Sequence, residues 1–249
     1  MVQWLTGIVD FVTWYKILGD VHTRQKRPIV MLHGGPGFNH MYIPVVFYDQ
    51  IDLRQYPDSP PEFWTVDFFK DELDNLLRHL GIRDNFDIFS HSWGGIFGSD
   101  YASNRMHPSL KRLILANTFC ADQLPDGLGD VLQKHEAEGI RHSPEYKETL
   151  AIYRNIHLCT LTSWPENLMD SMANGKGNRH PEFTMSKRLK DWSVIDVLHN
   201  VTCPTLLLSA PQDEMWESAV RPFFLNIPQC KWVELQNSSH VPMYEDPDK

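Results

Sequence analysis

The sequence predicts an α/β fold with a mostly parallel sheet, helices on both faces, and a helical cap inserted in its middle. Short apolar runs alternate with stretches of helical periodicity along the 249 residues, a pattern typical of a parallel sheet covered by helices. Residues 120–198 break the pattern, because they are polar and helical in tendency. We therefore expect a core at 1–119, a cap at 120–198, and a shortened second part of the core at 199–249.

Three short runs and one helix are predicted in the first third of the chain. Residues 11–17 are aromatic and β-branched, which favours a strand. The apolar runs at 28–32 and 44–48 read as buried strands. A helix is predicted over 65–80, with Thr65 as its cap and Gly81 at its end.

The remaining elements of the core follow the same alternation. Strands are predicted at 86–89, 110–117, 205–209 and 231–235, and helices at 94–106 and 217–226. The strands at 86–89 and 110–117 lie on either side of one of these helices, so the alternation of strand and helix continues here.

Composition excludes several classes of protein. The formal net charge of −9 argues against nucleic acid as a partner, since phosphate binding needs clustered Lys and Arg. The start of the chain lacks the basic and apolar regions of a signal peptide, and no run approaches the ~20 apolar residues that span a bilayer. We expect a soluble cytoplasmic protein that binds no membrane. The widely spaced Cys120, Cys159, Cys203 and Cys230 are expected to be free thiols.

The segment Ser90-His91-Ser92-Trp93-Gly94-Gly95 predicts a nucleophilic serine. It follows a predicted strand and precedes a helix, and a tight turn there pushes the Ser92 hydroxyl out of the sheet. The usual signature is G-x-S-x-G, and Ser90 replaces its first glycine with another small residue. An ordinary turn is the alternative. We expect His91 to be structural.

The segment His33-Gly34-Gly35-Pro36-Gly37 follows another predicted strand and suggests an oxyanion hole. Acyl transfer needs donors aimed at a developing alkoxide, and backbone N–H groups supply them. In this arrangement, one donor follows the nucleophile, here Trp93, and the other lies in the earlier loop, here Gly35. A plain turn is the alternative.

The predicted acid and base follow the nucleophile in the chain order Ser, Asp, His. Asp213 comes directly after the strand at 205–209, and His240 follows the strand at 231–235. Both fall where parallel strands end, which is where open α/β sheets place ligands. Imidazole takes the serine proton, and the carboxylate orients the imidazole. Asp52, Asp191 and Asp196 fit less well.

With these motifs in place, the chain resembles the proline iminopeptidase family of α/β-hydrolase peptidases, which includes amino-acid amidases. The resemblance runs over nearly the whole chain, through TWYKI, HGGPG, VVFYDQ, FWTVDFF, SHSWGG, YRNIHLCTLTSWPE, EFT, KDW, the Asp213-Glu214 pair and NSSHVPMYEDP. It implies an α/β-hydrolase fold and removal of an N-terminal residue, often proline, from short peptides or amides through an acyl-enzyme.

The resemblance also implies how such a substrate is held. Two acidic residues bind its free α-ammonium, and they correspond here to Glu214 and to Glu182 before Phe183-Thr184. A buried ammonium must be paired to avoid a large desolvation cost. The implied partner is a small peptide or amino-acid amide with a free N-terminus, and the chemistry needs no cofactor and no metal.

Two other functions remain open at this point. An esterase or lipase would share Ser92, Asp213 and His240 without needing the acidic pair. Departures from the family pattern favour a catalytically silent binding protein on a hydrolase scaffold, whereas the intact spacing of Ser92, Asp213 and His240 argues against it. Only twelve residues, His33 to Pro44, link two strands that are expected to be parallel, where a crossover usually needs about a dozen or more with a helix.

Overall fold

The computed structural model describes residues 2–5, 10–21, 27–34, 47–50, 64–120, 127–174 and 192–249. The strands are β1 Val2–Leu5, β2 Asp10–Lys16, β3 Ile29–Leu32, β4 Phe47–Asp49, β5 Phe86–His91, β6 Leu110–Ala116, β7 Thr205–Ser209 and β8 Cys230–Glu234. The α-helices are α1 Val66–His79, α2 Trp93–Asp100, α3 Gly127–Ala137, α4 Pro144–Tyr153, α5 Glu166–Asn174, α7 Glu217–Asn226 and α8 Pro242–Glu245. Tyr101–Arg105 (η3) and Arg154–Leu158 (η4) are π-helical turns, and Ile195–Asn200 (η5) is a 3-10 helix.

The strands form one sheet in the order β1-β2-β4-β3-β5-β6-β7-β8. The pairs from β4 through β3 to β8 are parallel, and β1 and β2 add antiparallel strands at one edge. The predicted fold class is thereby confirmed. One row of partners, Leu32, Ser90, Leu115 and Leu207, runs straight across the sheet and aligns the carboxyl ends of β3, β5, β6 and β7.

Helix α1 shows how local sequence decides where a helix begins and ends. The hydroxyl of Thr65 accepts a hydrogen bond from the Phe68 N–H at 3.1 Å, which confirms the predicted cap. Gly81 follows with φ of 65°, a conformation that glycine adopts at low cost. The predicted helix at 94–106 is α2, whose last turn widens into η3 before Met106 ends it in the left-handed region.

The core lies where α1, α2 and α7 pack on the parallel strands. This hydrophobic core consists of buried apolar side chains between residues 30 and 120 and between residues 194 and 227. It includes Val194 and Leu198 of the segment before β7. The largest include Trp64, Phe69, Phe86, Trp93, Phe97, Tyr101 and Phe223. The four cysteines are free, as predicted, and burial raises the pKa of the Cys120 thiol to about 12.

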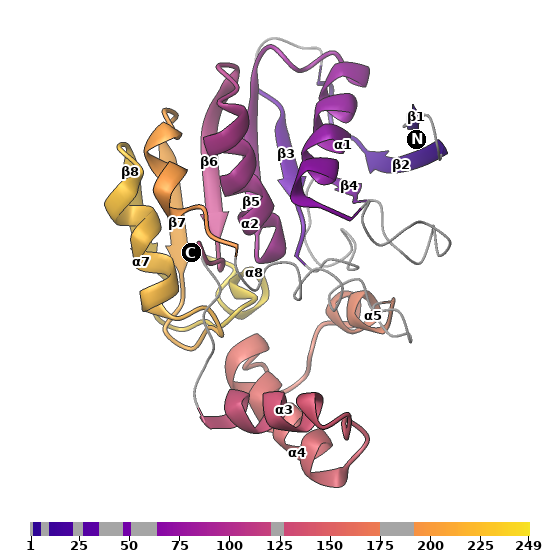
Figure 1. Ribbon diagram of the computed structural model, residues 1–249, viewed down its shortest axis with the longest axis vertical. Helices are drawn as coiled ribbons and strands as arrows, with labels where there is room; N and C mark the ends of the chain where they lie inside the picture. Colours follow the sequence, from indigo (N-terminus) through magenta and orange to yellow (C-terminus); the bar gives the residue numbers. More distant parts are fainter. Residues whose placement is uncertain are drawn as a thin grey trace.

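The helices α3, α4 and α5 lie beyond the carboxyl ends of the strands (Figure 1). A second, smaller apolar cluster joins α5 to the sheet through Leu168, Met31 and Val241. The segment from 120 to 198 is thus helical in the described residues, in keeping with a cap, and the domain boundaries themselves stay a prediction. In the described residues, no helix has the length and apolar character needed to cross a membrane.

Candidate active site

Ser92 lies at a strained turn between β5 and α2. Its φ of 54° and ψ of −124° fall in a region of backbone conformation that residues with a Cβ rarely adopt. The Ser92 N–H donates to the Ala116 carbonyl at 3.0 Å, and the Thr118 hydroxyl donates to the Ser92 carbonyl at 2.8 Å. Neighbouring β6 and the residues after it therefore hold the turn in place.

Small residues around Ser92 let the turn approach the sheet. A Cβ added to Gly94 would lie 2.0 Å from the Leu32 carbonyl oxygen, so only glycine fits there. Ser90 occupies the place of the usual glycine, and its buried hydroxyl donates to the Ile114 carbonyl at 2.7 Å. This hydrogen bond satisfies the extra polar group that the departure from G-x-S-x-G introduces.

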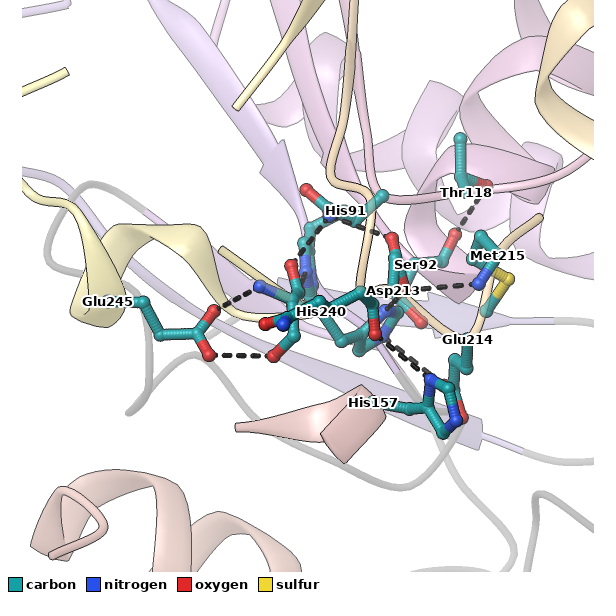
Figure 2. Close-up of polar contacts among 12 residues, drawn as sticks. His91, Ser92, Thr118, His157, Asp213, Glu214, Met215, His240 and Glu245 are labelled. Atoms are coloured by element: carbon teal, nitrogen blue, oxygen red, sulfur yellow. Dashed lines mark hydrogen bonds and ion pairs between the residues drawn. The ribbon is translucent and has the colours of Figure 1, made fainter. Parts of the chain in front are cut away.

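Asp213 and His240 come together at the same edge of the sheet. His240 Nδ1 donates to Asp213 Oδ1 at 2.8 Å, and both side chains are buried (Figure 2). The Met215 N–H donates to the same carboxylate oxygen at 3.1 Å. The proton on Nδ1 leaves Nε2 as the atom that can accept one from a nucleophile.

Asn117 connects this pair to the nucleophile turn. It follows β6 directly, with a φ of 50°, and is completely buried. Its Nδ2 donates to Asp213 Oδ2 at 2.8 Å and to the Ser239 carbonyl at 3.0 Å. One amide thus holds the carboxylate and the loop that carries His240, next to the strand end that holds Ser92.

His91 also supports His240. Its Nε2 donates to the His240 carbonyl at 2.7 Å, and the two rings are 4.9 Å apart between centroids. Burial, followed by the charge of His240, lowers the pKa of His91 to about 3, so the ring is neutral. This contact is consistent with the structural role expected for His91, and it places His240 beside the residue that precedes Ser92.

The charge state of His240 depends on its acidic neighbours. Burial by itself lowers the pKa of His240, but the charges of Asp213 and Glu214 outweigh it and raise the pKa to about 9. Glu214 Oε1 lies 3.6 Å from Nε2, and its Oε2 accepts a hydrogen bond from the Tyr153 hydroxyl at 3.3 Å. Within the described residues, no hydrogen bond joins Ser92 to His240, and Nε2 forms its ion pair with Glu214.

Glu245 of α8 holds the His240 loop from the other side. Its two oxygens accept four hydrogen bonds at 2.7 Å each, from the N–H and hydroxyl of Ser239 and of Thr160. The His240 N–H in turn donates to the His157 carbonyl at 3.1 Å. Residues after α4 therefore contact the proposed base directly.

A chain of hydrogen bonds leads from Trp93 to the predicted oxyanion loop. The indole of Trp93 donates to Gln50 Oε1 at 2.8 Å, and the Gln50 N–H donates to His33 Nε2 at 3.1 Å. His33 Nδ1 donates to the Gly34 carbonyl at 2.7 Å. The Trp93 N–H belongs to the first turn of α2, where backbone N–H groups have no partner within the helix.

The predicted site residues divide into two groups. Ser92, Trp93, Asp213, Glu214 and His240 lie at the carboxyl ends of β5, β7 and β8 or in the loops after them. Gly35 and Glu182 lie outside the described residues, and so do the less favoured Asp52 and Asp191. Asp196 is exposed in η5. The catalytic and binding roles themselves stay predictions.

Four residues make contacts around the site that were not identified from the sequence. These residues are Asn117, Thr118, Gln50 and Glu245. A signal was present for two of them, since Asn117 ends a predicted strand beside the nucleophile and Glu245 lies in NSSHVPMYEDP. Among the described residues, no group of His, Cys, Asp or Glu side chains is arranged to hold a metal ion.

Comparison with known proteins identifies the family of the chain. Residues 29–249 match the alpha/beta hydrolase family. The chain belongs to this family. The resemblance to proline iminopeptidases is also confirmed: the proline iminopeptidase of Flavobacterium johnsoniae is 27% identical over 281 residues, covering 99% of this chain and 93% of that protein. That of Saccharolobus solfataricus is 28% identical, with 98% of this chain and 86% of that protein covered.

Solved structures of related proteins match this chain over nearly its whole length. The crystal structure of VinJ matches with a TM-score of 0.83 and 32% identity, covering 99% of this chain and 94% of that one. The proline iminopeptidase of Mycobacterium smegmatis matches with a TM-score of 0.81 and 28% identity, covering 99% and 93%. The fold is thus shared along the full sheet.

Proposed function

We propose that this hydrolase is a serine aminopeptidase that releases an N-terminal residue, with proline favoured, from short peptides or amino-acid amides. The observation that carries the proposal is the buried contact of 2.8 Å between His240 and Asp213, beside a strained Ser92 turn. The proline iminopeptidases among its relatives support the class of substrate.

The proposed reaction begins with attack by Ser92 Oγ on the carbonyl carbon of the first peptide bond. His240 Nε2 takes the hydroxyl proton, and Asp213 stabilises the imidazolium that forms. Collapse of the tetrahedral intermediate breaks the C–N bond, and His240 returns the proton to the leaving amine. An ester between the released residue and Ser92 remains as the acyl-enzyme.

Water completes the cycle by the same route. His240 takes a proton from the water that attacks the ester carbonyl, and it then returns a proton to Ser92 Oγ as the amino acid leaves. In both halves, the Trp93 N–H and the Gly35 N–H are proposed to donate to the oxyanion. The hydrogen bonds that connect Trp93 through Gln50 to the loop at Gly34 support this pairing of donors.

Selection of the N-terminus is proposed to rest on Glu214 and Glu182. Glu214 is half-buried beside His240, so an ammonium paired with it would bring the first peptide bond, and no later one, next to Ser92. A partly buried carboxylate gains more from pairing with an ammonium than an exposed one does, because screening by water is weaker.

The test compares prolyl arylamide with its N-acetyl derivative. We expect turnover of the free amine and none of the acetylated substrate, measured as release of the arylamine. Equal rates on both would refute the role of the acidic pair, and a preference for simple acyl esters over amino-acid amides would favour an esterase.

Two serine variants test the nucleophile. Ser92→Ala should lower kcat/KM by about 10⁴-fold or more and abolish labelling by a fluorophosphonate probe. Ser99→Ala is the matched control, since Ser99 is also buried near this turn and, within the described part of the chain, its hydroxyl donates to the Ile96 carbonyl of its own helix. Ser99→Ala should keep both activity and labelling. Labelling that persists in Ser92→Ala would show another nucleophile.

A further inference from the structure

His240 Nε2, the ring nitrogen that would accept the Ser92 proton, has an acidic neighbour. Glu214 Oε1 lies 3.6 Å from Nε2, while Nδ1 is engaged by Asp213 at 2.8 Å. The second oxygen of Glu214 accepts the Tyr153 hydroxyl of α4 at 3.3 Å. The carboxylate is therefore held between the cap and the proposed base.

The groups around His240 favour its charged form in the empty site. Asp213 and Glu214 approach from the loop after β7, and Glu245 approaches from α8. On the β5 side, His91 is neutral, and η4 offers the His157 carbonyl. Three carboxylates thus surround one imidazole, and its pKa is about 9 in spite of burial. A protonated imidazole cannot accept the serine proton.

We propose that Glu214 forms an ion pair with His240 while the site is empty. The ammonium of an entering substrate then pairs with Glu214 instead and leaves Nε2 free to accept the proton of Ser92. This inference rests on the proposed function and gives Glu214 a second role in the same site. The same carboxylate thus binds the amine and makes His240 available as a base only when an amine is bound.

The exchange follows from charge alone. An ammonium beside Glu214 neutralises the carboxylate that favours the imidazolium, and its own positive charge disfavours a second positive charge nearby. Both effects lower the pKa of His240 in the complex. An ester without an amine provides neither effect, so it meets His240 mostly protonated at neutral pH. Selectivity for free N-termini then arises in the chemical step as well as in binding.

The experiment measures the pH dependence of hydrolysis of p-nitrophenyl acetate, which has no amine. In the wild type, kcat/KM should rise with pH through about 9, as His240 loses its proton. In Glu214→Gln the rise should move to lower pH, and the rate at about pH 7 should increase about tenfold for each unit of the shift. The same variant should lose activity on prolyl arylamide, chiefly through a higher KM.

The matched control is Glu217→Gln, which removes the same charge from an exposed position of α7 paired with Arg221. It should leave the ester profile and the arylamide kinetics unchanged. A second measurement needs no variant: kcat for prolyl arylamide in the wild type should rise at lower pH than kcat/KM for p-nitrophenyl acetate. Coinciding profiles would overturn the inference.

The outcomes separate this inference from the proposed function. An ester profile that does not move in Glu214→Gln, together with strict dependence on a free amine in the wild type, would overturn the exchange and leave the aminopeptidase intact. Equal wild-type rates on prolyl arylamide and its N-acetyl derivative would overturn the proposed function itself. Thermal unfolding of each variant checks that the protein is folded.

Discussion

Replacing Ser92 with glycine or with alanine measures the strain stored at the nucleophile turn. Both variants lack the hydroxyl, so their difference in stability reports the backbone alone. Ser92 has φ of 54° and ψ of −124°, a conformation that costs a residue with a Cβ about 1–3 kcal/mol. Glycine adopts it without that cost but gives up about 0.4–1 kcal/mol through the greater freedom of its unfolded chain.

The balance predicts that Ser92→Gly is more stable than Ser92→Ala by about 1 kcal/mol, which corresponds to about 2–4 °C in Tm for a chain of this size. Thermal and urea unfolding followed by circular dichroism provide the measurement. Ser99 supplies a control of opposite sign, because it lies inside α2, where glycine costs about 1 kcal/mol relative to alanine.

The reasoning would be refuted by an alanine variant at 92 that equals or exceeds the glycine variant in stability. That result would mean that the turn carries no strain of the kind its dihedral angles indicate. Agreement at Ser92 together with the opposite order at Ser99 would locate the strain at the nucleophile, and both Ser92 variants should be inactive on prolyl arylamide.

Two further predictions concern the support of the site. Gly94→Ala should fail to give soluble, active protein, because the added Cβ would lie 2.0 Å from the Leu32 carbonyl oxygen. The control is Gly139→Ala, where a Cβ meets nothing within 4 Å but φ is 71°. Comparing the yields of folded protein for the two variants separates the effect of a steric clash from that of backbone strain. The second concerns acid stability. The pKa of His91 is lowered to about 3 in the folded state, against about 6.5 when unfolded, so the unfolded chain binds the extra proton first and stability should decline as pH falls through that window. Urea midpoints should fall less steeply with pH in His91→Gln, and equal slopes would contradict the prediction.

The local elements of this protein could be predicted because each depends on a few neighbouring residues. Thr65 caps α1 through the N–H of the residue three positions on, and the apolar runs that became β5, β6 and β7 needed no knowledge of their partners. The Ser92 turn was predictable for the same reason, since the strand, Ser90, Ser92 and Gly94 lie within a few residues of one another in the chain.

Contacts that span the chain could not be predicted in this way. Asn117 donates to Asp213 and to the Ser239 carbonyl, 96 and 122 residues away, and it does so from a left-handed conformation that its sequence neighbours do not signal. Glu245 holds Thr160 across 85 residues. Such pairs depend on how far each strand extends and on which way each loop leaves the sheet.

Short-range patterns in the chain were enough to predict the parallel sheet, the nucleophile turn and the chain order of Ser92, Asp213 and His240, because periodicity and turn chemistry act over short distances. The assembled fold was needed to place Glu214 Oε1 3.6 Å from His240 Nε2, and to show that Asn117, His91 and Glu245 hold the loops. The direction of a buried side chain is set by the packing and charges of residues remote in the chain, and those meet only when the sheet is assembled.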